Sequence, residues 1–191
     1  MVQNLAADVD VFTSNVFLVE GARTVLVDPG ANFDVVSRIE ETVDDLDAVI
    51  VTHTHPDHVE NADAVADAYD VDVWGFDTDH PSIDERIKDG EVVQIGDDEY
   101  EALHTPGHKD DHLCFYAADD GVLFAGDLVF AGGGFGRTDL EEGDRPTLVR
   151  SIGRVMDRVD EDLSTLHCGH GPSVDDDAYA TIEQAHRMAR V

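Results

Sequence analysis

Cysteine, lysine and long apolar runs are scarce in this chain. Only two of its 191 residues are cysteines, Cys114 and Cys168, and the residues around them lack the cysteine spacing of a disulfide-stabilised secreted domain. The first ten residues have neither the basic start nor the apolar stretch of an export signal, and no later segment has the length and hydrophobicity of a membrane span. These absences predict a cytoplasmic protein with reduced thiols and no membrane partner.

Lysine and arginine together are few. The chain has 12 Lys and Arg residues against 43 Asp and Glu residues, which gives a formal net charge of −31. Acidic pairs such as Asp44-Asp45, Asp97-Asp98 and Asp119-Asp120 are spread along the whole chain. A docking surface for a basic partner would be local, so this distribution instead predicts an acidic shell, which would repel the phosphates of nucleic acids. We expect a halophilic protein, since molar salt shortens the screening length to about 3 Å and weakens repulsion among carboxylates.

The segment from His53 to His58, with the sequence His-Thr-His-Pro-Asp-His, carries three imidazoles and a carboxylate directly after an apolar run. Residues two apart in an extended chain point the same way, so His53 and His55 can face one metal ion. Pro56 can open a helix whose first turn holds Asp57 and His58. Histidine is the commonest metal ligand, so the segment predicts two adjacent metal positions. A solvated polar turn is the alternative interpretation.

Three later segments add candidate ligands. His108 follows a Pro-Gly turn, and Asp127 ends an apolar run that finishes in small residues. His170 lies between two glycines, in the kind of turn that brings a side chain close to a ligand. Cys168 is a weaker candidate, and we favour a buried structural role for it.

The hydrophobic pattern indicates one α/β domain spanning residues 1–191. Its first half ends near Asp89-Gly90, and both halves contribute candidate ligands. We expect strands near residues 9–13, 15–20, 23–28, 47–52, 71–75, 91–94, 99–104, 112–117, 121–126 and 163–167. We expect helices near residues 32–43, 57–69, 81–88, 145–159 and 174–190.

Taken together, these motifs resemble the metallo-β-lactamase superfamily, whose pattern is H-x-H-x-D-H, then a distant H, a D and a final H. The resemblance implies a four-layer αββα sandwich of two mixed β-sheets flanked by helices. It also implies two divalent metal ions. The implied ligands are His53, His55 and His108 for the first ion, Asp57, His58 and His170 for the second, and Asp127 as the carboxylate shared by both.

Such a site implies a hydrolase. Two close cations hold a hydroxide at neutral pH, and this hydroxide would attack a carbonyl that the first metal polarises. Asp57 would be a catalytic residue, because it would orient the hydroxide as well as bind the second metal. Histidine and carboxylate ligands suit zinc, iron or manganese, and the order of metal affinities favours zinc.

The segment from Asp127 to Leu140 resembles the glyoxalase II branch, the hydroxyacyl-thiol thioesterases, in its glycine-rich loop and its basic residue. This resemblance implies a small thioester as the substrate. Arg137 would either bind a substrate carboxylate or form a salt bridge with Asp139 or Glu141. The segment after His108 departs from the branch pattern, and the chain lacks the branch's helical extension, so the acyl group and the thiol stay open.

Three other functions remain open. The residues from Gly136 to Asp139 also resemble the persulfide dioxygenase branch, which uses one iron, although the retained His170 argues against it. Lactone or lactam hydrolysis, which also occurs in the superfamily, is the second. The third is a non-catalytic metal-binding protein, which would require a broken site, and no ligand position is broken. The sequence does not indicate an oligomeric state.

The acidic shell predicts that salt stabilises the folded protein. We expect the melting temperature to rise steadily from low salt to molar potassium chloride, because screening reduces carboxylate repulsion in the compact state. Thermal unfolding followed by circular dichroism in a potassium chloride series measures this. A melting temperature that is flat or falls with salt would rule out the halophile interpretation.

Overall fold

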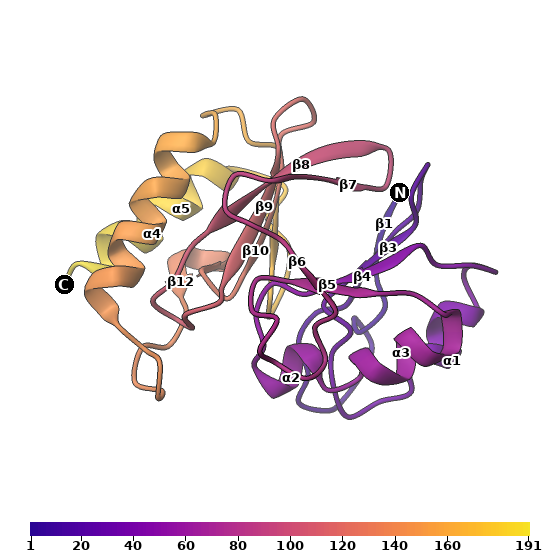
Figure 1. Ribbon diagram of the computed structural model, residues 1–191. Helices are drawn as coiled ribbons and strands as arrows, with labels where there is room; N and C mark the ends of the chain where they lie inside the picture. The colour runs from indigo at the N-terminus through magenta and orange to yellow at the C-terminus, as the bar shows by residue number, and fades with distance from the viewer. The chain divides into compact units, whose positions relative to one another are not determined.

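A computed structural model describes the whole chain, residues 1–191, and Figure 1 shows its elements in chain order. The chain forms two compact units. The first contains Met1–Ile87 and Gln94–Glu99, and the second contains Lys88–Val93 and Tyr100–Val191. The assignment of residues 1–191 to one domain stays a prediction.

The first unit is built on a six-stranded mixed sheet with the strand order β1-β2-β3-β4-β5-β6. Strands β1 to β3 are antiparallel, and β3 to β6 pair in parallel. Its strands are β1 (Val2–Asn4), β2 (Phe17–Val19), β3 (Val25–Val27), β4 (Ala48–Ile50), β5 (Val73–Gly75) and β6 (Glu85–Arg86). Its helices are α1 (Val35–Glu40), α2 (Pro56–Val59) and α3 (Ala62–Tyr69).

Apolar residues on both faces make the centre of this sheet rigid. Every residue of β2, β3 and β4 is buried, which is the pattern of strands covered on both sides. Helix α1 begins where Asp34 accepts a hydrogen bond from the Ser37 amide at 3.1 Å, and its Ile39 packs into the same core as Val49 of β4. The segment of candidate ligands from His53 to His58 therefore follows a strand that is fully buried.

The second unit is built on a five-stranded mixed sheet with the strand order β13-β10-β9-β8-β7, in which β10 and β13 are parallel. The strands of this sheet are β7 (Val92–Ile95), β8 (Asp98–His104), β9 (Leu113–Ala117), β10 (Val122–Gly126) and β13 (Thr165–Cys168). The end of β7 and the start of β8 lie in Gln94–Glu99, which belongs to the first unit. A hairpin of β11 (Val129–Phe130) and β12 (Gly134–Phe135) encloses the short 3-10 helix η1 (Ala131–Gly133). The helices are α4 (Arg145–Arg158) and α5 (Ala178–Ala189), which pack against each other (Figure 1).

Helix α4 has the local signals that the sequence indicates. Its first turn contains Pro146, and the Asp144 side chain caps it by accepting a hydrogen bond from the Thr147 amide at 2.8 Å. Leu148 and Ile152 lie in the core that α4 and α5 share with the second sheet. One face of this sheet is thus covered by helices.

Two expected elements are wrong. Residues 9–13 form a loop, in which Phe12 is 75% exposed, so the alternating apolar residues have no sheet face to bury. The loop is held instead by hydrogen bonds from the Asn32 side-chain amide to the Phe12 carbonyl and from the Ala31 amide to Thr13 Oγ1. Hydrogen bonds with residues 31 and 32 therefore replace the strand ladder here.

The expected helix at 81–88 is also absent, and part of the segment forms strand β6. Ile83 and Ile87 are four residues apart, which is helical spacing, but both are buried in an extended segment beside β5. The Asp84 carboxylate accepts a hydrogen bond from the Val73 amide at 2.9 Å, and the Ile87 amide donates to the Gly75 carbonyl at 2.7 Å. Pairing with a distant strand therefore overrides the local periodicity.

None of the helices combines the length and the hydrophobicity needed to cross a membrane.

His167 of β13 gives the second unit a pH dependence. Burial lowers the pKa of His167 from 6.5 to about 4, and its ring stacks on Phe124 with centroids 4.8 Å apart. In the unfolded chain this ring binds a proton below pH 6.5, whereas in the folded protein it binds one only below about pH 4. The free energy of unfolding is therefore highest above pH 6.5 and decreases as the pH falls towards about 4.

We expect His167→Gln to remove this part of the acid sensitivity. The difference in unfolding free energy between wild type and variant should therefore shrink as the pH falls from 7 to 4. Denaturant unfolding in molar potassium chloride at several pH values measures it. A difference that stays constant over the whole range would contradict the assignment.

Candidate metal centre

The first group of candidate ligands follows β4. His53 is buried, and its Nε2 lies 3.0 Å from Nδ1 of His55, with the two rings perpendicular to each other. His55 is the N-cap of α2, and Pro56 opens that helix as the sequence predicts. Asp57 and His58 lie in this single turn, and the rings of His53 and His58 are 4.1 Å apart. Three imidazoles are thus gathered by one strand end and one helical turn.

A buried carboxylate fixes the orientation of two of these rings. Asp28 Oδ2 lies 2.8 Å from Nδ1 of His58 and accepts the Thr52 hydroxyl at 2.8 Å. Because the Thr52 hydroxyl proton is used there, its oxygen accepts from Nδ1 of His53 at 3.1 Å. Both histidines consequently carry their proton on Nδ1 and a lone pair on Nε2, the state in which imidazole binds a metal.

Backbone hydrogen bonds hold the turn that contains Asp57. The Ser14 amide donates to the Asp57 carbonyl at 3.0 Å, and the Gly30 amide donates to the His58 carbonyl at 3.1 Å. The Asn61 amide in turn donates to the Gly30 carbonyl at 3.0 Å. Hydrogen bonds from two earlier loops, which contain Ser14 and Gly30, therefore hold this turn.

His108 lies in the loop between β8 and β9. It is buried, and its Nδ1 donates to the Arg137 carbonyl at 2.8 Å, which places the lone pair on Nε2 as in His53 and His58. Gly107 precedes it with φ of 123°, and a Cβ at this position would lie 2.2 Å from the Leu148 amide nitrogen. Only glycine allows the loop to pass this close to α4.

Asp127 follows β10 directly and is buried. Its Oδ2 lies 3.4 Å from Nε2 of His108 and 3.6 Å from Nε2 of His170. A Cβ on Gly136 would lie 2.0 Å from the Asp127 carbonyl oxygen, so the glycine-rich segment passes directly over this residue. Asp127 is thus the common neighbour of two candidate histidines.

His170 follows β13 in a turn that ends in Gly171, whose φ is 74°. Its side chain is 31% exposed, whereas the side chain of His108 is 4% exposed. The neighbouring Cys168 is buried, and burial raises the pKa of its thiol to about 11. The thiol form packs in the core, as the sequence interpretation favours.

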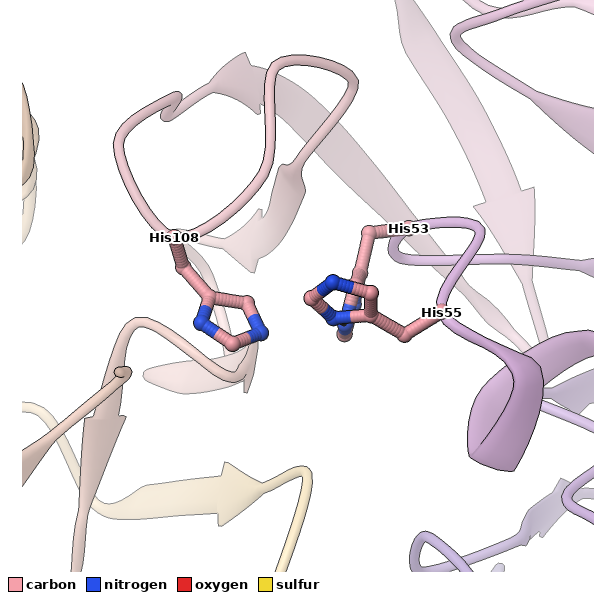
Figure 2. A group of neighbouring side chains, drawn as sticks. All are labelled: His53, His55 and His108. Atoms are coloured by element: carbon pink, nitrogen blue, oxygen red, sulfur yellow. Dashed lines mark hydrogen bonds between the residues drawn. The ribbon is translucent and has the colours of Figure 1, made fainter. Parts of the chain in front are cut away.

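The side chains form three groups of potential metal ligands, and within each group all ligand atoms lie within 4.8 Å of one another. Figure 2 shows the first group, in which the three rings turn towards one another. The groups are His53, His55 and His108; His53, His58 and Asp127; and Asp57, His58 and His170. All seven residues that the sequence singles out as ligands belong to at least one group.

The donor set fits a pair of divalent cations. Nitrogen and carboxylate oxygen atoms alone make up the three groups, and no thiolate takes part. Such ligands suit zinc, iron and manganese. The Nδ1 hydrogen bonds of His53, His58 and His108 add the orientation that metal-binding imidazoles need.

Arg137 forms the salt bridge that the sequence analysis gives as one of two alternatives. Its guanidinium donates to both carboxylate oxygens of Asp139, at 2.9 and 2.8 Å. The two side chains are 68% and 70% exposed. The Arg137 backbone has a separate role, because its carbonyl holds His108.

Three residues with structural roles at the site are missing from the sequence-based set of site residues. Asp28 and Thr52 hold His58 and His53, and His112 accepts a hydrogen bond from the Asp127 amide at 3.0 Å. The sequence does contain a signal for Asp28, which is an acidic residue at the end of an apolar strand. Nothing local to the sequence pairs it with a histidine 30 positions away.

Sequence comparison relates the chain to a known protein family. Residues 9–176 match the metallo-β-lactamase superfamily. A Haemophilus influenzae protein named hydroxyacylglutathione hydrolase GloC is 31% identical over 185 residues, which cover 85% of this chain and 84% of the relative. The resemblance seen in the ligand motifs is therefore confirmed over most of the chain.

Comparison with solved structures confirms the expected α/β fold class, with two mixed β-sheets and helices. The crystal structure of the BLEG-1 B3 metallo-β-lactamase matches with a TM-score of 0.77 and 25% identity, over 96% of this chain and 95% of that one. The di-iron-bound form of TTHA1623 matches with a TM-score of 0.76 and 26% identity, over 94% and 96% of the two chains.

The hydrogen bonds of Asp28 predict that this carboxylate controls metal affinity. Asp28→Asn places an amide N–H opposite either the Nδ1–H of His58 or the backbone N–H of Thr52, so one of these hydrogen bonds is lost and the ligand rings lose part of their support. We expect zinc to bind about 10- to 100-fold more weakly. Titration of the metal-free protein against a chelating indicator measures the affinity.

Asp34→Asn is the matched control, since Asp34 caps α1 at the surface and asparagine caps a helix equally well. Equal zinc affinity in the two variants would contradict the role of Asp28.

Proposed function

The chain belongs to the metallo-β-lactamase superfamily, and from this premise we propose that it is a dinuclear metal hydrolase that cleaves a small hydroxyacyl thioester. In this proposal His53, His55 and His108 hold one divalent ion. Asp57, His58 and His170 hold the other. Asp127 binds both, as the sequence motifs imply.

The observation that carries the proposal is the grouping of these ligands around shared members. His53 and His58 each belong to two of the three groups, and Asp127 lies within 3.6 Å of the ring nitrogens of both His108 and His170. Overlapping groups are what a pair of neighbouring ions requires, whereas a single ion requires only one group. The buried hydrogen bonds to three of the histidines support the same interpretation.

Bound in this way, the two ions would supply a hydroxide nucleophile at neutral pH and polarise the substrate carbonyl. Asp57 would accept a hydrogen bond from the attacking water and orient it. Its backbone, held by the Ser14 amide, keeps the carboxylate at a fixed position on α2. A thiolate leaving group needs no proton donor.

Thioester chemistry is supported by the relative named hydroxyacylglutathione hydrolase GloC, which is of comparable length. We propose Arg137 as the residue that binds a carboxylate of the substrate. Its present partner Asp139 is highly exposed, and exposed ion pairs contribute little to stability, so exchanging Asp139 for a substrate carboxylate costs little.

Zinc is the metal we favour, and iron and manganese are the alternatives. The order of affinities for nitrogen and oxygen ligands supports zinc. The di-iron form of a structurally similar protein supports iron. Elemental analysis of the protein purified without added metal distinguishes them.

A second candidate, lactam hydrolysis, is supported by the likeness to the BLEG-1 B3 metallo-β-lactamase. The third, a mononuclear iron persulfide dioxygenase, rests on the sequence from Gly136 to Asp139. It requires one iron per chain and oxygen uptake on a persulfide, so metal content and an oxygen electrode separate it from a hydrolase.

We place the enzyme in a salt-rich cytoplasm, as a protein without nucleic acid or membrane partners. The support is the net charge of −31 and the dispersed acidic residues. Potassium at molar concentration would screen this charge.

The proposal predicts an order of substrates. In molar potassium chloride with added zinc, we expect hydroxyacyl thioesters to give a higher kcat/KM than lactones and cephalosporins. Asp127→Asn should lower kcat/KM by at least about 100-fold, because it removes the carboxylate that both ions share. Thioesters as the slowest class would overturn the substrate assignment.

Arg137→Gln tests substrate binding separately, with Arg150→Gln as the matched control. Arg150 is an exposed arginine of α4 that bonds only its own helix, at Thr147. We expect Arg137→Gln alone to raise KM for thioesters that carry a carboxylate.

A further inference from the structure

His112 is a fully buried histidine that the proposed function does not use. It directly precedes β9, four residues after His108 in the same loop. Its Nδ1 lies 2.8 Å from Thr105 Oγ1, and its Nε2 lies 3.0 Å from the backbone nitrogen of Asp127. The side chain therefore connects the loop of one proposed ligand to the backbone of another.

The direction of these two hydrogen bonds follows from elementary chemistry. A backbone amide can only donate, so His112 Nε2 is an acceptor and carries no proton. The proton of the neutral ring is then on Nδ1, where it donates to the Thr105 hydroxyl. His112 thus has the same tautomer as His53, His58 and His108, but its Nε2 lone pair accepts the Asp127 amide instead of facing a metal position.

The position of Asp127 explains why such an acceptor is needed. Asp127 is the first residue beyond β10, and the pairing of β10 with β13 is irregular between Phe124 and Gly126. Gly126 has φ of 49°, so the backbone turns away from the sheet immediately before Asp127. A buried amide at such a turn must find an acceptor outside the strand ladder, and His112 supplies it.

The loop that contains His112 also contains His108, which lies beside the Asp127 carboxylate. His108 Nε2 is 3.4 Å from Asp127 Oδ2, and the rings of His108 and His112 are perpendicular, with centroids 6.3 Å apart. The loop from Thr105 to His112 thus fixes a ligand through His108 and the backbone of Asp127 through His112. A shift of either would change the distance between the imidazole and the carboxylate.

We propose that His112 is a positioning residue that sets the carboxylate of Asp127 for the metal pair. This inference rests on the proposed dinuclear site. It predicts that losing the acceptor at Nε2 weakens metal binding even when the fold and the buried volume are kept. Because Asp127 is shared, both ions should bind more weakly.

Two polar variants separate positioning from simple filling of space. The amide oxygen of glutamine in His112→Gln can reach the place of Nε2 and accept the Asp127 amide. The shorter side chain of His112→Asn reaches only the place of Nδ1, beside Thr105. His167→Gln is the matched control, because it replaces a partly buried histidine of the same unit whose Nδ1 bonds Ser173.

The test titrates metal-free protein with zinc against a chelating indicator, and with cobalt while the absorption spectrum reports ligand geometry. We expect His112→Asn to bind about 10- to 100-fold more weakly than wild type with an altered cobalt spectrum. His112→Gln should stay within about threefold of wild type, and His167→Gln should match it. Circular dichroism in molar potassium chloride confirms that each variant is folded.

Equal affinity of the asparagine and glutamine variants, whether both strong or both weak, would overturn the positioning role. A variant that does not fold is replaced by Thr105→Val, which keeps His112 but removes the acceptor of its Nδ1 proton, and unchanged metal binding would then overturn the role. A wild-type protein that binds fewer than two ions would instead overturn the proposed function, so the two failures are distinguishable.

Discussion

Hydrogen bonds at the Nδ1 atoms of the candidate histidines are the constraint on which the site depends. Asp28, Thr52 and the Arg137 carbonyl each accept such a bond, and each bond places the lone pair of its ring on Nε2. An imidazole without this partner can rotate or change tautomer. The metal chemistry proposed here therefore depends on polar groups that never touch a metal.

Several candidate ligands lie just beyond the ends of strands, so the strands determine where their backbone begins. His53, Asp127 and His170 follow β4, β10 and β13, whose side chains are largely buried. The buried strands fix the position of the backbone before each ligand, and the short turns after them determine where each side chain points. The exposed ion pair of Arg137 and Asp139 contrasts with this arrangement.

The sequence singles out the candidate ligands because their signal is local, and their binding of metal stays a prediction. The six residues from His53 to His58 carry their spacing with them, and Pro56 opens α2 as expected. Interactions between distant residues were not predictable in this way. Asp28 meets His58 across 30 positions, and the segment containing Ile83 and Ile87 pairs with β5 despite its helical spacing.

Anomalous diffraction from crystals of the metal-loaded protein tests the central claim most directly. The account predicts two peaks per chain, one bonded to His53, His55 and His108 and the other to Asp57, His58 and His170, with the carboxylate of Asp127 bonded to both. A single peak, or peaks bonded to other residues, would contradict it.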